Sequence, residues 1–244
     1  SIPTRDDDAI SMRMAARESN AIQHIVPLGD LLALSGAAEW RIGSNEGAAL
    51  SPSNLRVRAQ SYVGAGQATP VVIGNAVVFP AGRGGHIREL GYNSDAGGYV
   101  TGDLSLKAPH LFDNFDIVDM AYQRCPMPVV WAVSTTGLLL GLTYVPEQQV
   151  GAWHWHDTGA SGAFESVCVI PEGDEDVLYA VVRRTINGAE VRYVERMASR
   201  TFIDLSDAFF VDAGGTYSGA ATTTITGLTW LEGQTVAVLA DGAE

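Results

Sequence analysis

The chain has 244 residues, of which 46% are hydrophobic and 27 are glycine, and its formal net charge at pH 7 is −13. This composition is typical of a globular protein built from short strands and tight turns, and it argues against disorder. The negative charge argues against a protein that grips nucleic acid, because phosphate contacts require clustered lysine and arginine. Every apolar run is shorter than the roughly 20 residues that span a bilayer, so no membrane insertion is expected.

The chain has two cysteines, Cys125 and Cys168. Two cysteines are too few for a disulfide framework, and they lack the spacing of a metal site. Cys168 alternates with apolar neighbours, which predicts a buried and inert thiol, whereas Cys125 precedes a proline in a loop. The chain begins without a methionine or a signal-peptide pattern and stops directly after a strand-like run, so we expect both ends to be cut.

The first elements in chain order are one short helix and two groups of strands. Three aspartates, Asp6 to Asp8, precede residues 9–17, where they could cap one or two helical turns. A strand meander follows over 24–44, and a further strand-like segment covers 56–64. A second meander covers 71–92 and contains the glycine-rich stretch AGRGGH, which is typical of a hairpin turn.

The middle of the chain departs from this pattern and then returns to it. Residues 93–114 alternate little, and their leucines together with Phe112 predict a short helical insertion. A strand is expected again at 116–123. Two strong meanders then cover 128–157 and 162–197.

The clearest turn in the chain is Asn187-Gly188, which separates two apolar strand patterns. Both residues tolerate the positive φ of a type I′ turn, so this pair predicts a tight hairpin. Four meanders on one plan predict an all-β, mostly antiparallel fold with a β-propeller-like body of repeated blades. Continuous apolar runs fit blades that are covered on both faces. The alternative fold is a β-sandwich.

Near residue 200 the repeated strand pattern ends and a loop-rich sequence begins. We therefore expect residues 1–200 to form the propeller-like body. Residues 201–244 are expected to form a connector and the start of a second small β module.

His154 and His156 are the only weak candidates for metal ligands. On a strand they point to one face, while Trp153 and Trp155 point to the other. A zinc site needs a third and usually a fourth ligand, which the sequence does not supply nearby. The favoured interpretation is a blade strand in which tryptophan fills one interface and histidine packs against the other.

Charged residues cluster in two further places. Glu172, Asp174, Glu175 and Asp176 form one short run, which is typical of a solvated loop rather than of a glycosidase acid pair. Four arginines surround the last hairpin and are interface candidates: Arg183, Arg184, Arg192 and Arg196. They are expected either to pair across strands with Glu190 and Glu195 or to meet an acidic neighbouring subunit. No catalytic residue and no cofactor site is predicted, because no nucleophile or phosphate-binding motif is present.

From about residue 6 to residue 241 the chain resembles the tail nozzle proteins of short-tailed bacteriophages and prophages, also called tail tubular protein B. The most specific stretches are LTYVPEQQVGAWHWH, GAFESVCVIP and VVRRTINGAEVRYVERM. TTTITGLTWLEGQTVAVLADG resembles the module that follows in longer members. Full members of the family extend further at both ends.

The resemblance implies a structural protein of the virion tail, made in the bacterial host cytoplasm and free of enzymatic activity. It implies a homo-hexameric ring around the DNA-exit channel, with other tail proteins as partners and with DNA passing through without specific binding. An acidic wall would suit such a channel, because it repels phosphate.

Two alternatives come from other functional classes. One is a carbohydrate- or receptor-binding tail module with exposed aromatic residues such as Tyr217 or Trp230, and the other, less favoured, is a β-fold glycan hydrolase. Exposure of Trp153 and Trp155 would favour binding, whereas their burial between blades would favour a scaffold.

Overall fold

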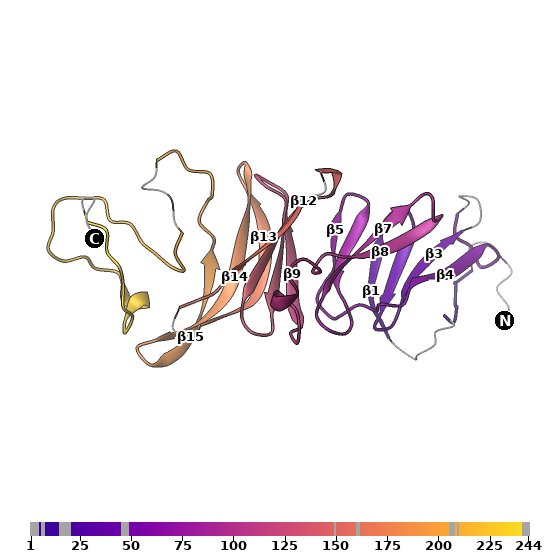
Figure 1. Cartoon of the computed structure of the whole chain (residues 1–244), viewed down its shortest axis with the longest axis horizontal. Helices are drawn as coiled ribbons and strands as arrows, with labels where there is room; N and C mark the ends of the chain where they lie inside the picture. The colour runs from indigo at the N-terminus through magenta and orange to yellow at the C-terminus, as the bar shows by residue number, and fades with distance from the viewer. Residues whose placement is uncertain are drawn as a thin grey trace. The chain divides into compact units, whose positions relative to one another are not determined.

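The structure is a computed structural model that describes residues 5, 8–14, 21–44, 49–148, 150–159, 162–204, 208 and 210–240 (Figure 1). Its regular elements are almost all antiparallel strands, which confirms the predicted all-β class. The chain divides into two compact units, Ser1–Tyr122 and Gln123–Glu244. No helix among the described residues has the length and apolar character needed to cross a bilayer.

Four sheets follow one another along the chain, and in each of them consecutive strands are neighbours. The first contains β1 (Ile22–Pro27), β2 (Leu31–Ser35), β3 (Glu39–Ser44) and β4 (Leu55–Ser61). The second contains β5 (Val71–Ile73), β6 (Ala76–Pro80), β7 (Ile87–Asn93) and β8 (Gly98–Asp103). The third contains β9 (Ile117–Gln123), β10 (Val129–Ser134), β11 (Leu139–Val145) and β12 (Val150–His156). The fourth contains β13 (Ala163–Glu172), β14 (Glu175–Ile186) and β15 (Ala189–Arg196).

Each predicted meander forms one of these sheets, and the first three sheets have four strands rather than three. Four-stranded antiparallel meanders are the unit from which propeller blades are built. None of the four sheets closes on itself among the described strands. The meander plan is therefore confirmed, and a closed propeller ring stays a prediction.

The first unit has apolar residues on both faces of its first sheet. Leu32 and Leu34 are fully buried in a cluster with Val77, Phe79 and Leu90 of the second sheet, whose other members are Val26, Ala65 and Tyr99. Between those two leucines, Ala33 points to the opposite face and packs with Ala38, Trp40 and Ile42. Both faces of β2 are thus covered, which explains why its sequence is a continuous apolar run.

The hairpin of β14 and β15 forms as predicted. Ile186 pairs with Ala189 across the two-residue turn, in which Asn187 has a φ of 48° and Gly188 a φ of 76°. Positive φ at both central positions is the geometry that an Asn-Gly pair favours. Figure 1 shows β14 between β15 and β13, which is the order of the strands in this sheet.

Two predictions for the first unit are wrong in detail. Residues 93–114 contain the strand β8, and their helical part is limited to the single 3₁₀ turn η1 (Pro109–Leu111). The remaining helix prediction, over 9–17, is not met in residues 9–14, which form no helix, and residues 15–17 lie outside the described residues. A short N-terminal segment gains too few hydrogen bonds to offset the cost of helix nucleation.

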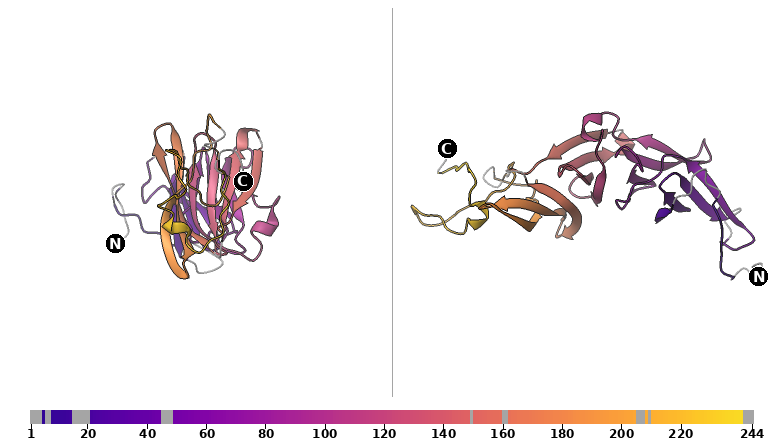
Figure 2. Two further views of the ribbon diagram at one scale, coloured as in Figure 1. Left: turned by 90° about the vertical axis from the view of Figure 1, so that its left-hand side faces the viewer. Right: turned by 90° about the horizontal axis from the view of Figure 1, so that it is seen from below.

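The C-terminal segment forms no strand within the described residues of 201–240, so the predicted first strands of a second β module are absent there. Among its described residues, the regular element is the 3₁₀ turn η4 (Thr229–Leu231), visible as the yellow turn in Figures 1 and 2. Apolar residues of this segment stay exposed, including Val238 at 58% and Leu239 at 73%. A strand requires a pairing partner, and an isolated extended segment does not form one.

This segment is held to the second unit at two places. Asp212 receives hydrogen bonds from Arg184 and from the backbone N–H of Gly159. Further along, the carbonyl of Glu232 accepts from the backbone N–H of Asn187 at 3.2 Å, and the side chain of Gln234 donates to the carbonyl of Thr185 at 2.9 Å. The first attachment joins Asp212 to β14 and to the β12–β13 loop. The second joins Glu232 and Gln234 to the β14–β15 turn and to the end of β14.

Candidate functional site

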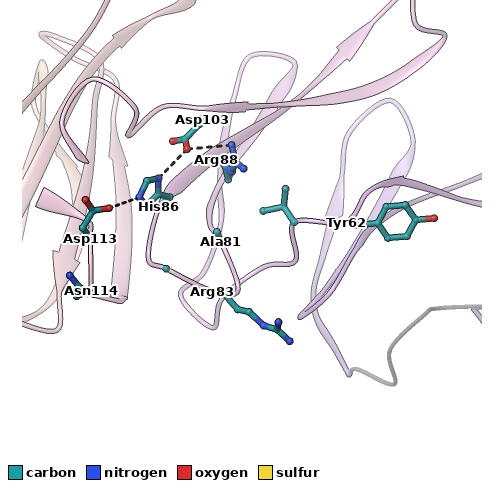
Figure 3. Close-up of a pocket in the computed structure, with 10 residues that line it drawn as sticks. Tyr62, Ala81, Arg83, His86, Arg88, Asp103, Asp113 and Asn114 are labelled. Atoms are coloured by element: carbon teal, nitrogen blue, oxygen red, sulfur yellow. Dashed lines mark hydrogen bonds and ion pairs between the residues drawn. The ribbon is translucent and has the colours of Figure 1, made fainter. Parts of the chain in front are cut away.

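A polar cavity of about 720 Å³ lies in the first unit, where connections from its two sheets meet (Figure 3). The lining residues come from the β4–β5 and β6–β7 connections, from β7 and β8, and from the chain after η1. They are Tyr62, Val63, Ala81, Arg83, Gly84, His86, Arg88, Asp103, Asp113 and Asn114. The stretch AGRGGH is the β6–β7 connection, as predicted, but its contribution to a cavity could not be inferred from its composition.

Close backbone packing holds the loops of this cavity in place. The N–H of Gly82 donates to the carbonyl of Gly64 at 2.8 Å. Gly85 has a φ of 65°, and a Cβ at this position would lie 1.7 Å from the carbonyl oxygen of Phe115. Only glycine fits such an approach, so the positions of these loops are fixed by the sequence.

His86 joins two carboxylates at the centre of the cavity. Its Nδ1 lies 3.0 Å from Oδ2 of Asp103, and its Nε2 lies 3.1 Å from Oδ1 of Asp113. The hydrogen bond to Asp103, aided by Asp113, raises the pKa of His86 above its ordinary value. Each ring nitrogen thus faces a carboxylate oxygen, an arrangement that favours the doubly protonated ring because an ionised carboxylate only accepts hydrogen bonds.

Asp103 connects His86 to a neighbouring arginine. Its Oδ2 also lies 3.4 Å from Nη1 of Arg88, and its Oδ1 accepts from the backbone N–H of Ser105. The lining residues include no serine, threonine or cysteine, which are the ordinary nucleophiles of acyl transfer.

The second unit places His154 and His156 against Trp131, on one face of the third sheet. The ring centroids of His154 and His156 lie 5.5 Å and 5.7 Å from that of the fully buried Trp131. Trp131 donates through Nε1 to Oε1 of Gln123 at 3.0 Å, and the guanidinium of Arg200 lies 5.6 Å from the Trp131 ring centroid. His154 and His156 therefore pack against a tryptophan of their own sheet, and their packing against a neighbouring blade stays a prediction.

Burial determines the charge of these two histidines. It lowers the pKa of His154 to about 4, and the nearby His156 and Arg200 act in the same direction. Burial also lowers the pKa of His156, whose Nε2 has no hydrogen-bond partner among the described residues. Within the described part of the chain, no group of three or more His, Cys, Asp or Glu side chains is arranged to hold a metal ion.

The tryptophans of β12 lie on the opposite face, next to buried leucines of β11. Trp155 pairs with Leu140 and Trp153 pairs with Leu142. Because β12 is the outer strand of its sheet, Trp155 remains 52% exposed, while Trp153 is half-buried. The exposure of Trp155 favours a binding role, whereas the partial burial of Trp153 favours a scaffold.

The four arginines of the last hairpin all have carboxylate partners within the second unit. Arg183 lies 3.1 Å from Glu190, and Arg192 lies 2.7 Å from Glu165. Arg196 lies 2.9 Å from Glu172, a residue of the acidic run. These contacts include one of the predicted cross-strand partners, and whether the arginines also meet another subunit stays a prediction.

Arg184 is the most buried of the four and has the largest network. It donates to both oxygens of Glu195, the other predicted partner, and to both oxygens of Asp212. These bonds raise its pKa further and keep it charged. Asp212 lies 28 residues further along the chain, and no local pattern pointed to it.

The acidic run and the cysteines differ in part from their predictions. The run spans the β13–β14 hairpin, but only Asp174 lies in the turn, whereas Glu172, Glu175 and Asp176 lie on the strands. Asp176 also accepts from the backbone N–H groups of Arg124 and Cys125. Cys168 is exposed, not buried, because it lies on the solvent face of β13, opposite Tyr179. Cys125 is exposed as well.

No protein-family model matches this chain, and no curated protein matches it.

Proposed function

We propose that this protein is a structural component of the virion tail of a short-tailed bacteriophage or prophage. In this proposal it belongs to the tail nozzle and forms part of the wall of the DNA-exit channel. It acts as a homo-hexameric ring, together with other tail proteins, and it catalyses no reaction.

The observation that supports this proposal most is that the residues on which the resemblance mainly depends also stabilise the fold. Those residues lie between 142 and 197 and span β11 to β15. Within them, His154 and His156 pack on Trp131, Asn187 forms the turn, and Arg184 joins neighbouring segments through its carboxylate partners. Distinctive residues that stabilise the fold are expected of a protein whose task is mechanical.

The proposal is tested by locating the protein. Mass spectrometry and immunogold electron microscopy of purified virions, induced from a strain that carries the gene, should place the protein at the tail. Its absence from intact virions would contradict the proposal. Light scattering across a concentration series tests the ring separately, because about six copies are expected if the interface lies within these residues.

A binding role at the tail is the second candidate, and the exposed ring of Trp155 favours it. Exposed aromatic rings on an otherwise folded sheet are common at interaction sites. Trp155→Ala should then abolish attachment to host cells and leave the homo-hexameric assembly intact. If the substitution instead disrupts the homo-hexamer, Trp155 belongs to the interface between subunits.

A further inference from the structure

We infer that the outer edge of β15 pairs with residues 235–239 of a second copy of this chain, which thereby adds a fourth strand to the fourth sheet. The inference identifies the contact through which copies associate. It does not depend on the proposed role in a virion tail, because it concerns the surface of the second unit alone.

The fourth sheet has one strand fewer than the other three. Its order is β13-β14-β15, so β15 forms one outer edge, and no described strand pairs with it on that side. Six of the eight residues of β15 are exposed, among them Val194 at 75%. Within the described part of the chain, this edge is therefore open to solvent.

The pairing with β14 determines which backbone groups of β15 point outward. Ile186 and Ala189 flank a two-residue turn, and such a pair exchanges both of its backbone hydrogen bonds. Bonded pairs alternate along an antiparallel ladder, and the N–H of Met197 continues this alternation by donating to the carbonyl of Leu178 at 2.9 Å. The even-numbered residues of β15 therefore direct their N–H and C=O groups away from β14: Glu190, Arg192, Val194 and Arg196.

This edge lacks three features by which natural proteins prevent pairing between strands. β15 contains no proline and no lysine, and its register with β14 has no bulge. Two of its arginines are already paired inside the sheet, Arg192 with Glu165 and Arg196 with Glu172. An uncharged strand can therefore add to this edge without introducing a like charge.

Residues 235–239, with the sequence TVAVL, have the composition of such a strand. They are uncharged, three of the five are β-branched, and they include neither glycine nor proline. All five are exposed, and no described strand pairs with them. Exposed segments of this composition add readily to free strand edges. The chain thus carries both an open edge and a segment that fits it.

The attachment of the C-terminal segment indicates that the added strand comes from a second copy. Glu232 and Gln234 bond to Asn187 and Thr185, so the segment starts beside the β14–β15 turn. Because β15 starts at the same turn, residues 235–239 can follow the β15 of their own copy only in the parallel direction. The pairs of this sheet are antiparallel, and antiparallel pairing is the more stable kind. A second copy enters from the opposite end and completes an antiparallel sheet.

The donated strand and the accepting edge are different surfaces of the chain. Each copy therefore donates to one neighbour and accepts from another, which is a heterologous contact. Repeated heterologous contacts produce closed rings or open filaments rather than dimers. Assemblies larger than a dimer are expected.

Light scattering of the full chain across a concentration series tests the inference with two blocking variants. Val194→Pro removes an outward N–H and keeps the bonds to β14, since proline is tolerated where the N–H of an edge strand faces solvent. The double substitution Ala237→Pro and Val238→Pro removes a donor from both sides of the donated segment. The unsubstituted chain should exceed twice the monomer mass of 25.8 kDa, and each variant alone should stay at the monomer mass.

An equimolar mixture of the two variants shows which copy supplies the strand. The first variant still donates its segment and the second still has a free edge, so the mixture should form a dimer and nothing larger. If the unsubstituted chain or the mixture stays monomeric at every concentration, the inference is wrong. Absence of the protein from virions would leave these masses unchanged, so this test is separate from that of the proposed function.

Matched controls separate strand pairing from misfolding. Val194→Thr keeps the N–H and the branched shape, and the pair Ala220→Pro and Ala221→Pro places prolines at exposed positions elsewhere in the C-terminal segment. Both controls should assemble like the unsubstituted chain, and loss of assembly in either would contradict the inference. If circular dichroism shows that Val194→Pro is unfolded, Val194→Lys replaces it, because an edge lysine blocks pairing without changing the backbone.

Discussion

Gly141 provides the sharpest test of the packing in the second unit. It lies opposite both Trp131 and His154 in the third sheet. A Cβ at this position would be 2.2 Å from Nε2 and 2.4 Å from Cε1 of His154. Ordinary contact begins near 3.4 Å, so the imidazole would have to move by more than 1 Å. It has little room to do so, because it packs against Trp131 and against the ring of His156 at 5.2 Å.

We therefore expect Gly141→Ala to lower the free energy of unfolding by about 2 kcal/mol, within the usual cost of overpacking. The matched control is Gly151→Ala on β12, where a Cβ would meet no atom within 4 Å. That control should change stability by less than about 0.5 kcal/mol. Urea denaturation followed by tryptophan fluorescence measures both variants.

A double-mutant cycle separates this contact from a general effect on β11. Gly141→Ala and His154→Ala should be coupled by about 1–2 kcal/mol, because removing the imidazole removes the overlap. Equal stability of the two glycine variants, or a coupling energy near zero, would refute the packing argument.

Three other predictions concern the turn, the buried arginine and the histidines. Asn187→Ala should cost about 1 kcal/mol, because alanine is strained at positive φ, while Asn187→Gly should be nearly neutral by thermal denaturation. Arg184→Gln should cost about 2–3 kcal/mol in urea, since it leaves two partly buried carboxylates without their cation, whereas Arg192→Gln on the exposed face should change stability little. Because the folded state lowers the pKa of His154 to about 4, the unfolded chain binds its proton first; the urea midpoint should fall as pH drops from about 6.5 to about 4, and less steeply in His154→Gln.

Local signals in the sequence were sufficient to predict most strands and the best turn. The apolar runs of β10 and β11 and the Asn187-Gly188 pair identify their own structure, because each depends on neighbouring residues. The strand β8 was missed because GYVTGD has glycine at two positions and only short alternation. Its place is determined by pairing with β7, for which the isolated segment gives little signal.

The candidate cavity could not be predicted, because its residues meet only through the fold. His86, Asp103 and Asp113 are separated by up to 27 residues and have no motif spacing. The same is true of Arg184 and Asp212. The one usable signal was the glycine-rich stretch before His86, and it indicated a turn without indicating what the turn would hold.

The two attachments of the C-terminal segment have a consequence for how firmly it stays in place. While Asp212 is bound, Gln234 is tethered by a loop of known length, so its rebinding is intramolecular and its effective concentration is high. Each attachment thus strengthens the other, although neither touches the other directly. A single cut between residues 213 and 231 would leave the bonds of Asp212, Glu232 and Gln234 in place and still end this mutual support. The distal part would then be held only by the bonds of Glu232 and Gln234 and would dissociate as a separate peptide.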